Sequence, residues 1–197
     1  MVYNVAITGA SGMLYADRLL RFLVQEELPV NLMVSEPAWS VLQQELGCPE
    51  LPSSERQQWV NQCYGTNIKL YANNDWSAPV ASGSAQFAGL VILPCSMGTL
   101  GRIAAGISTS LIERCADVCL KERRKLILVV REMPLNLIHL ENMTKLAQAG
   151  AVIMPASPGF YHNPTTVEDL VDFVVGRVLT VMGVENSVVQ QWGATIE

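Results

Sequence analysis

The chain has 197 residues, of which 50% are hydrophobic and 16% are charged, and its formal net charge at pH 7 is -5. This length and composition exclude a disordered chain and predict a single α/β domain over 1–197, with 184–197 as a C-terminal tail. The negative charge argues against a general nucleic-acid surface and favours a small-molecule ligand. We expect no signal peptide and no membrane span, and five scattered cysteines are typical of a reduced cytoplasmic protein.

Short apolar runs between turn signals predict five buried parallel strands, at 2–7, 30–34, 90–93, 126–130 and 151–154. Amphipathic patterns between and after them predict helices, with shared faces formed by Leu19, Leu20, Leu23 and Val24, then by Leu137, Leu140, Met143, Leu146 and Ala147, then by Leu170, Phe173, Val174, Val178 and Leu179. This alternation predicts a doubly wound parallel sheet in a flavodoxin-like, Rossmann-like three-layer sandwich.

Two local signals mark the limits of the last helix, and one stretch resists assignment. Thr165 and Glu168 stand at capping-box spacing after Pro164, and Gly183 is expected to end the helix. The more polar stretch 48–84 is predicted to be an irregular excursion within the domain.

Small and polar residues follow four of the predicted strands. These are the turn 9–12, Ser35, the segment 94–99 and the segment 131–134. Ligands of doubly wound sheets bind beyond the carboxyl ends of the strands, and two of these turns lead into helices whose N-terminal N–H groups attract anions. The spacing of the first turn matches neither the dinucleotide nor the Walker pattern. We therefore predict a phosphorylated cofactor lying across this rim.

Longer motifs give a family resemblance. The chain contains TGASG, YADRLL, NDW followed by SGS, PCSMGTLGRIAAGIS, LIERCADVCLKERRKLILVVREMPL, HLENMTKLAQAGAVIMPASPGFYHNP and VEDLVDFVVGRVL. In this order, over about nine tenths of the chain, they resemble UbiX-type flavin prenyltransferases. The resemblance implies an enzyme that moves a dimethylallyl group from dimethylallyl phosphate to N5 and C6 of reduced FMN. It also implies a homododecamer with sites completed by neighbouring subunits, and prenylated FMN as a product for a UbiD-type decarboxylase.

The resemblance implies an FMN site formed by Gly9, Ala10, Ser11, Ser35, Ser96, Met97, Gly98, Thr99 and Arg131. Arg131 offers a guanidinium fork suited to flavin oxygens, although a salt bridge to a neighbouring carboxylate is the alternative. Ser11 has the alternative role of a helix N-cap. Many family members have lysine at the position of Gly98, so phosphate binding is expected to depend more on backbone amides. Glu36 is expected to point to solvent, away from a phosphate.

For the prenyl donor, the resemblance implies a phosphate site of Arg114, Lys121, Tyr161 and Arg177, with Trp76 and Ser82 beside the prenyl chain. Cations would stabilise the leaving phosphate, and an indole face would stabilise an allyl cation. Trp76 can instead be ordinary core, and the basic run that begins at Lys121 can be a solvated helix end.

Glu45 and Glu132 match the acid/base glutamates of the family, and Ser11 matches a residue that passes a proton near N5. The alternatives are an ion pair between Glu132 and Arg131, and a surface position for Glu45. Cys115 and Cys119 lack companion ligands, so we expect no metal and ordinary packing.

Two other function classes stay open at this point. One is a flavin-dependent decarboxylase of the phosphopantothenoylcysteine type, acting on a cysteine substrate, which calls for an early catalytic histidine and an Asn-bearing turn in place of PCSMGT. The other is a noncatalytic FMN carrier, which gives no purpose to the four prenyl-phosphate residues.

Overall fold

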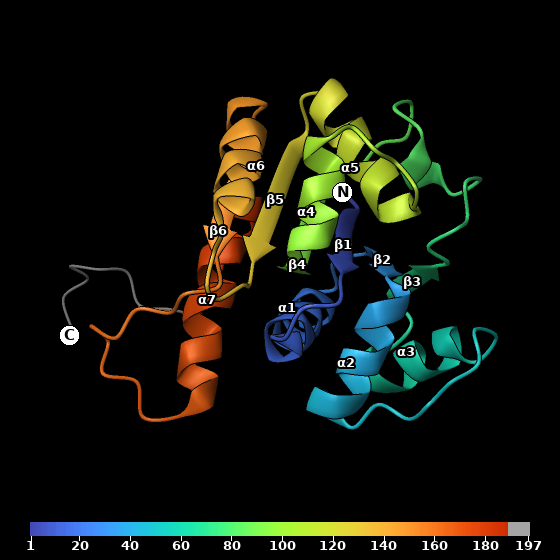
Figure 1. Cartoon of the computed structure of the whole chain (residues 1–197). Coiled ribbons are helices and arrows are strands. Elements are labelled where there is room, and N and C mark those ends of the chain that lie inside the picture. Colours follow the sequence, from blue (N-terminus) through green and yellow to red (C-terminus); the bar gives the residue numbers. More distant parts are fainter. Residues whose placement is uncertain (189–197) are drawn as a thin grey trace.

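A six-stranded parallel sheet lies at the centre of the computed structural model, which describes residues 1–188, and helices cover both faces of the sheet (Figure 1). The strand order is β3-β2-β1-β4-β5-β6. The strands are β1 (Tyr3–Ile7), β2 (Val30–Val34), β3 (Ile68–Tyr71), β4 (Gly89–Cys95), β5 (Lys125–Val130) and β6 (Val152–Pro155), and the helices are α1 (Met13–Gln25), α2 (Glu36–Leu46), α3 (Arg56–Tyr64), α4 (Met97–Ala104), α5 (Leu111–Lys121), α6 (Leu137–Gln148) and α7 (Val167–Met182), with a 3-10 turn η1 (Pro79–Ala81).

Two hydrophobic clusters separate the three layers. Side chains alternate along β1, so Val5 and Ile7 join the cluster that contains residues of α1, α2, α3 and α7, whereas Ala6 joins the cluster of α4, α5 and α6. All the strands run parallel, but the order in which the chain adds them reverses at β1: β2 and β3 follow on one side of β1, and β4, β5 and β6 follow on the other. The predicted doubly wound, flavodoxin-like fold is confirmed, and its switch point lies at the carboxyl ends of these strands.

The stretch 48–84 is not the irregular excursion that its polarity suggests, because it contains α3, β3 and η1. The strand β3 has four residues, including an exposed lysine, and within residues 1–188 it pairs only with β2. In α3 only Val60 and Tyr64 are buried, so its periodicity is weak. Short edge elements bury too few side chains to give a clear sequence pattern.

The two last helices depart from their sequence patterns in different ways. On α6 only Leu146 is buried, while Leu137 and Leu140 of the predicted apolar face are exposed. On α7 the capping box uses Thr166 and Asp169, one residue later than the predicted Thr165 and Glu168, and Gly183 ends the helix in the left-handed conformation as expected.

The predicted single domain with a tail at 184–197 stays a prediction, because most of that tail lies outside the described residues. Val184 packs into the core below α7. Within the part of the chain that the structure describes, no helix has both the length and the apolar character needed to cross a membrane.

A buried threonine joins the two central strands at their carboxyl ends. The hydroxyl of Thr8 donates to the carbonyl oxygen of Pro94 at 2.8 Å and accepts from the N–H of Ser96 at 2.8 Å. The backbone N–H of Thr8 also donates to the Pro94 carbonyl, at 3.2 Å. These bonds fix the turn after β4 against the turn after β1.

Replacing Thr8 by valine keeps the side-chain shape and removes the hydroxyl. The half-buried N–H of Ser96 then loses its acceptor, so we expect Thr8→Val to lower the free energy of unfolding by about 1–2 kcal/mol, measured by urea unfolding. The matched control is Thr144→Val, whose exposed hydroxyl bonds within α6. We expect the control to change stability by less than about 0.5 kcal/mol, and equal effects of the two variants would contradict this role for Thr8.

Candidate active site

A cavity of about 360 Å³ opens at the carboxyl ends of β1, β2 and β4. Five residues predicted to bind a flavin line it together: Gly9, Ser35, Ser96, Gly98 and Thr99. The structure therefore brings the ends of three separate strands to one space, as parallel strand direction requires.

The helix α4 points its N-terminus toward this cavity. Ser96 is its N-cap residue, and the Ser96 hydroxyl accepts from the N–H of Thr99 at 3.4 Å and lies 3.1 Å from the Thr99 hydroxyl. The side chain of Met97 is buried in the core, so a ligand of this cavity can meet only its backbone. The end of α4 is a suitable place for an anion because its first N–H groups and its dipole are both positive there.

The hydroxyl of Ser35 indicates whether a polar ligand fits this cavity. Its hydroxyl oxygen is buried, lies in a residue that lines the cavity, and has no hydrogen-bond partner among the described residues. Gly9, which lines the same cavity, packs closely against α2: a Cβ there would lie 2.6 Å from the Cβ of Pro37. A buried hydroxyl without a partner is costly, so the site fits a ligand that bonds to it, such as the phosphate or ribityl chain of FMN.

Ser11, Glu45 and Arg131 form a second group on the same rim. Glu45 reaches from α2 and accepts from the N–H groups of Gly12 at 3.0 Å and Met13 at 2.7 Å. The expectation of free amides at the start of α1 is therefore wrong for these two residues, whose donors are satisfied by the chain itself. Gly12 and not Ser11 is the N-cap residue, which removes the alternative role considered for Ser11.

Hydrogen bonds keep Glu45 ionised. Burial would raise the pKa of Glu45, but hydrogen bonds from the Ser11 side chain and from the amides of Met13 and Gly12, together with the charge of Arg131, lower it below 4.5. The carboxylate thus lies beside Ser11 and Arg131, rather than on an unrelated surface.

Arg131 is oriented by the turn after β1. Its Nε donates to the carbonyl oxygen of Ser11 at 3.2 Å. The structure shows no ion pair between Arg131 and Glu132 among the described residues; the Glu132 carboxylate instead accepts from the N–H of Met133 at 3.1 Å. Neither of the two alternatives is present in the described part of the chain: Arg131 forms no salt bridge with Glu132 and none with another carboxylate.

Three of the residues predicted for the prenyl donor lie along α5 and the segment after η1. Arg114 donates from Nε to the carbonyl oxygen of Ala81 at 3.0 Å, next to Ser82, and from Nη1 to Asp117 at 2.6 Å. Lys121 lies beside Gly83, where a Cβ would come within 2.7 Å of its Nζ, and it pairs with Glu122.

Tyr161 and Arg177 gather elsewhere, around Phe173 of α7. The ring centroids of Tyr161 and Phe173 are 5.6 Å apart, and Arg177 and Phe173 line a cavity of about 200 Å³ beside β6. Because α7 and α5 cover opposite faces of the sheet (Figure 1), one chain does not bring the four predicted phosphate ligands together.

Trp76 and Glu36 lie at the outer side of the rim. Trp76 is 52% exposed in the loop after β3, so it is not a core residue. Glu36 is largely exposed and forms a bidentate pair with Arg56, with oxygen–nitrogen distances of 2.6 and 2.9 Å, while Arg56 lies over the ring of Trp39. Glu36 also lines the first cavity, where the expectation places it away from a phosphate, and there its charge is neutralised by Arg56. The pair borders a second cavity of about 620 Å³, which shares Glu36, Asn73, Thr109 and Ser110 with the first.

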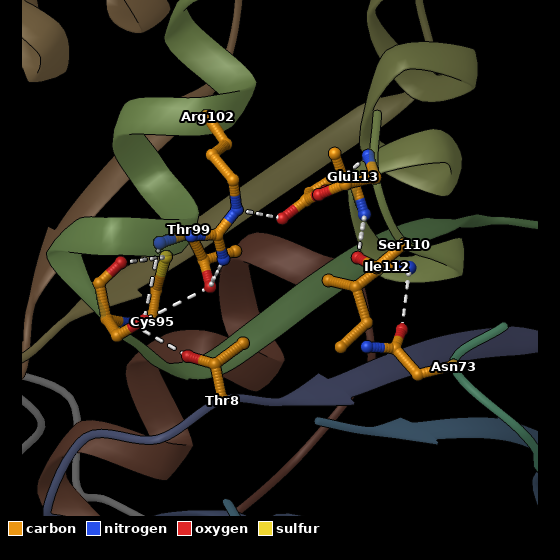
Figure 2. A network of polar contacts seen from close by, with 10 residues as sticks. Thr8, Asn73, Cys95, Thr99, Arg102, Ser110, Ile112 and Glu113 are labelled. Atoms are coloured by element: carbon orange, nitrogen blue, oxygen red, sulfur yellow. Dashed lines mark hydrogen bonds and ion pairs between the residues drawn. The ribbon is translucent and has the colours of Figure 1, made fainter. Parts of the chain in front are cut away.

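The sequence analysis missed a polar network on the far wall of the cavity (Figure 2). Arg102 pairs with the buried carboxylate of Glu113, which also accepts from the N–H and the hydroxyl of Thr109, each at 2.7 Å. Ser110 and Glu113 do have capping-box spacing, which signals the start of α5. That signal gives no indication that the carboxylate binds Arg102, because this contact depends on the fold.

The thiol of Cys95, at the rim, has low reactivity. Cys95 is fully buried, and burial raises the pKa of its thiol to about 12, so the nucleophilic thiolate is scarce at neutral pH. Within residues 1–188 no group of three or more histidine, cysteine, aspartate or glutamate side chains is placed to hold a metal.

Comparisons with known proteins show the family of the chain. The family model described as Flavoprotein matches residues 3–179. The flavin prenyltransferase UbiX of Alkalihalophilus pseudofirmus is 47% identical over 98% of this chain and 96% of its own length. The chain belongs to the flavin prenyltransferase family.

Two solved structures extend the comparison with the flavin prenyltransferase family to three dimensions. AnUbiX (PadA1), in complex with FMN and dimethylallyl pyrophosphate, has a TM-score of 0.87 and 37% identity, covering 99% of this chain and 98% of that one. A dodecameric FMN-dependent UbiX-like decarboxylase from Escherichia coli O157:H7 has a TM-score of 0.86 and 37% identity, covering 98% of this chain and all of that chain. The similarity of the whole fold therefore includes the rim that holds the cavity.

The carboxylate of Glu45 is expected to stabilise this flavin prenyltransferase fold in a pH-dependent way. A pKa lowered by folding gives stability that is present above the ordinary value of 4.5 and lost as the pH falls through the folded-state value. Glu45→Gln removes the charge at the start of α1, and we expect it to lower the free energy of unfolding by about 0.5–1 kcal/mol at pH 7, a modest effect because the group is solvent-screened. Denaturant unfolding from pH 7 to pH 3 should show the difference closing.

Glu141→Gln is the matched control, since Glu141 is exposed on α6. We expect this control to show no comparable pH-dependent difference. A constant gap between wild type and Glu45→Gln across the acid range would contradict an ionised Glu45 at α1.

Proposed function

We propose that this protein transfers a dimethylallyl group from dimethylallyl phosphate to N5 and C6 of reduced FMN, and so makes prenylated FMN. The observation that supports this most strongly is the 47% identity, over 98% of the chain, with a relative named flavin prenyltransferase. A similar solved structure, AnUbiX, is a complex with FMN and dimethylallyl pyrophosphate. The buried, unpartnered Ser35 hydroxyl in a rim cavity supplies independent support, because it calls for a polar ligand there.

The chain divides the binding of FMN between its two rim groups. Gly9, Ser35, Ser96, Gly98 and Thr99 surround the cavity, with backbone contributions from Ala10 and Met97, and the positive end of α4 favours the phosphate. Arg131 lies beside Ser11, where its remaining guanidinium N–H groups can bond flavin oxygens in pairs. When bound, reduced FMN supplies the nucleophilic N5.

Glu45, Glu132 and Ser11 are the proton-handling residues. Ser11 hydrogen-bonds to the Glu45 carboxylate, so a proton accepted by the Ser11 oxygen can pass to Glu45. Glu132 is exposed beside Arg131 on the same rim. We assign to Glu132 the transfer of a proton to the leaving phosphate, because the Glu45 carboxylate is bound by two backbone amides and lies next to Ser11.

Binding of the prenyl phosphate falls to Arg114, Lys121, Tyr161 and Arg177. Cations at this position stabilise the negative charge that builds on the phosphate as the allylic C–O bond breaks. Trp76 and Ser82 are assigned to the prenyl chain, with the exposed indole face of Trp76 available to an allyl cation.

A homo-oligomer, with a dodecamer as the expected size, would complete this site. Arg114 and Lys121 lie on one face of the sheet and Tyr161 and Arg177 on the other, so a neighbouring copy must supply one pair. Apolar side chains suited to such an interface are exposed along α6 and the preceding loop: Met133, Leu135, Leu137, Ile138 and Leu140. The dodecameric relative from Escherichia coli supports this assembly.

Prenylated FMN is a cofactor and not an end product, so we propose a UbiD-type decarboxylase as its recipient. We also propose a cytoplasmic location, since all five cysteines are free in a fold that buries four of them.

The reaction itself is tested by the mass of the flavin. Anaerobic incubation of the protein with reduced FMN and dimethylallyl phosphate should give a flavin heavier by one C5 unit, detected by mass spectrometry after extraction. Dimethylallyl pyrophosphate is the parallel donor, since it occupies the solved AnUbiX complex. An unchanged flavin mass with both donors would favour the carrier, and loss of carboxyl from a cysteine substrate would favour the alternative decarboxylase.

Subunit complementation tests the divided phosphate site. We expect Arg114→Gln and Arg177→Gln each to lower the rate of prenyl transfer by about a hundredfold, because each removes a cation from the leaving phosphate. In random mixed oligomers of the two variants, about a quarter of the sites would pair two intact faces, so activity should return to roughly that level.

The matched control mixes Arg114→Gln with Lys121→Gln, which damage the same face of the sheet. Every site in those oligomers carries one damaged residue, so we expect no recovery. Equal activity in the two mixtures would contradict a site shared between subunits.

A further inference from the structure

Arg102 is held rigidly at the edge of the rim cavity. Its Nε donates to the carboxylate of Glu113, and its Nη2 donates to the hydroxyl of Thr99 at 3.3 Å. The Glu113 side chain is only 2% exposed, whereas that of Arg102 is 45% exposed. The guanidinium is therefore anchored from the buried side and open on the cavity side.

Glu113 is itself fixed as an anion. Burial would raise its pKa, but hydrogen bonds from Arg102 and Thr109 outweigh burial and lower the pKa below its ordinary value. A buried carboxylate with three donors holds its partner in one orientation at little further entropic cost. The pair is thus a positioned guanidinium and not a mobile surface arginine.

The open side of Arg102 faces the start of α4. A Cβ built on Gly98 would lie 3.5 Å from its Nη1, so the guanidinium borders the first turn of that helix. Ser35, with its unpartnered hydroxyl, lines the same cavity. A fixed cation, a helix N-terminus and a free hydroxyl together match the oxygens of a phosphate monoester.

Other charges near the cavity do not compete for this role. Arg56, the arginine of the adjoining cavity, is already bound by both carboxylate oxygens of Glu36. Arg131 contacts Ser11 at the other group on the rim. Arg102 is therefore the arginine that lines the same cavity as Ser35 and Thr99.

We propose that Arg102, positioned by Glu113, binds the phosphate of FMN and makes the site selective for FMN over riboflavin. The inference rests on the proposed function, since it names the ligand of the same site. Arg102 would thus supply the positive charge for the phosphate that Gly98 does not supply. It also explains why a buried glutamate lies next to a site for an anion: the carboxylate orients the arginine.

The test compares two flavins that differ only by the phosphate. Titration of flavin fluorescence gives dissociation constants of the wild type and Arg102→Gln for FMN and for riboflavin. We expect Arg102→Gln to weaken FMN binding by about tenfold to a hundredfold, the loss of a charge-assisted hydrogen bond, and to leave riboflavin binding unchanged. Arg102→Lys should recover part of the FMN affinity, because a positive charge remains.

Two further variants keep the result interpretable. Arg102→Gln strands a buried carboxylate and can destabilise the fold, so Arg102→Gln/Glu113→Gln removes both charges together and should show the same selective loss. Arg18→Gln is the matched control: Arg18 pairs with Asp172 between α1 and α7, away from the cavity, and its side chain is similarly exposed. We expect it to change neither dissociation constant.

Each outcome decides the inference. Equal loss for both flavins would show that Arg102 only shapes the site, and unchanged FMN binding would place the phosphate elsewhere; either result overturns the inference while the proposed function stands. Failure of the wild type to bind either flavin would overturn the proposed function, and the inference with it.

Discussion

The bond between the Thr8 hydroxyl and the turn after β4 sets the positions on which the rim depends. Parallel strands bring their carboxyl ends to one edge, but they do not by themselves fix how the following turns face one another. The Thr8 hydroxyl accepts from the Ser96 N–H and donates to the Pro94 carbonyl oxygen. This aims the first turn of α4 across the switch point toward Ser35. The walls of the cavity that belong to α4, including Thr99 and Arg102, are positioned by that turn.

This acidic chain uses several of its carboxylates as structural groups at the rim. Glu45 satisfies the amides at the start of α1, Glu113 orients Arg102, and Glu36 is bound by Arg56. Each carboxylate has its partner at hydrogen-bond distance. Dissolved salt screens such close contacts less than it screens charges that lie farther apart. The net charge of -5 therefore says little about the local potential at the rim. It does exclude a broad basic surface, which is a different property.

Much of the fold was predictable because buried parallel strands give continuous apolar runs, and the carboxyl-end rule then located Gly9, Ser35 and Ser96 on one rim. The missed elements, α3 and β3, lie at the sheet edge and bury few side chains. The contact between Arg102 and Glu113 was not predictable from spacing, because the two residues belong to different helices that only tertiary packing brings together. The exposed apolar face of α6 shows the same limit: periodicity indicates that a face will be covered, but not by which chain.

The separation of the prenyl-phosphate residues has a physical reason in the three-layer fold. A sheet with helices on both faces separates α5 from α7, and the predicted phosphate ligands on them lie on opposite faces within one chain. In the proposed assembly, a single chain holds the flavin at its rim, whereas the leaving phosphate is clamped only where two chains meet. An allyl cation is quickly captured by water, and a site that closes only on assembly excludes water at that point. The exposure of Trp76 in one chain is consistent with this arrangement, because its indole face is left for a surface that another copy covers.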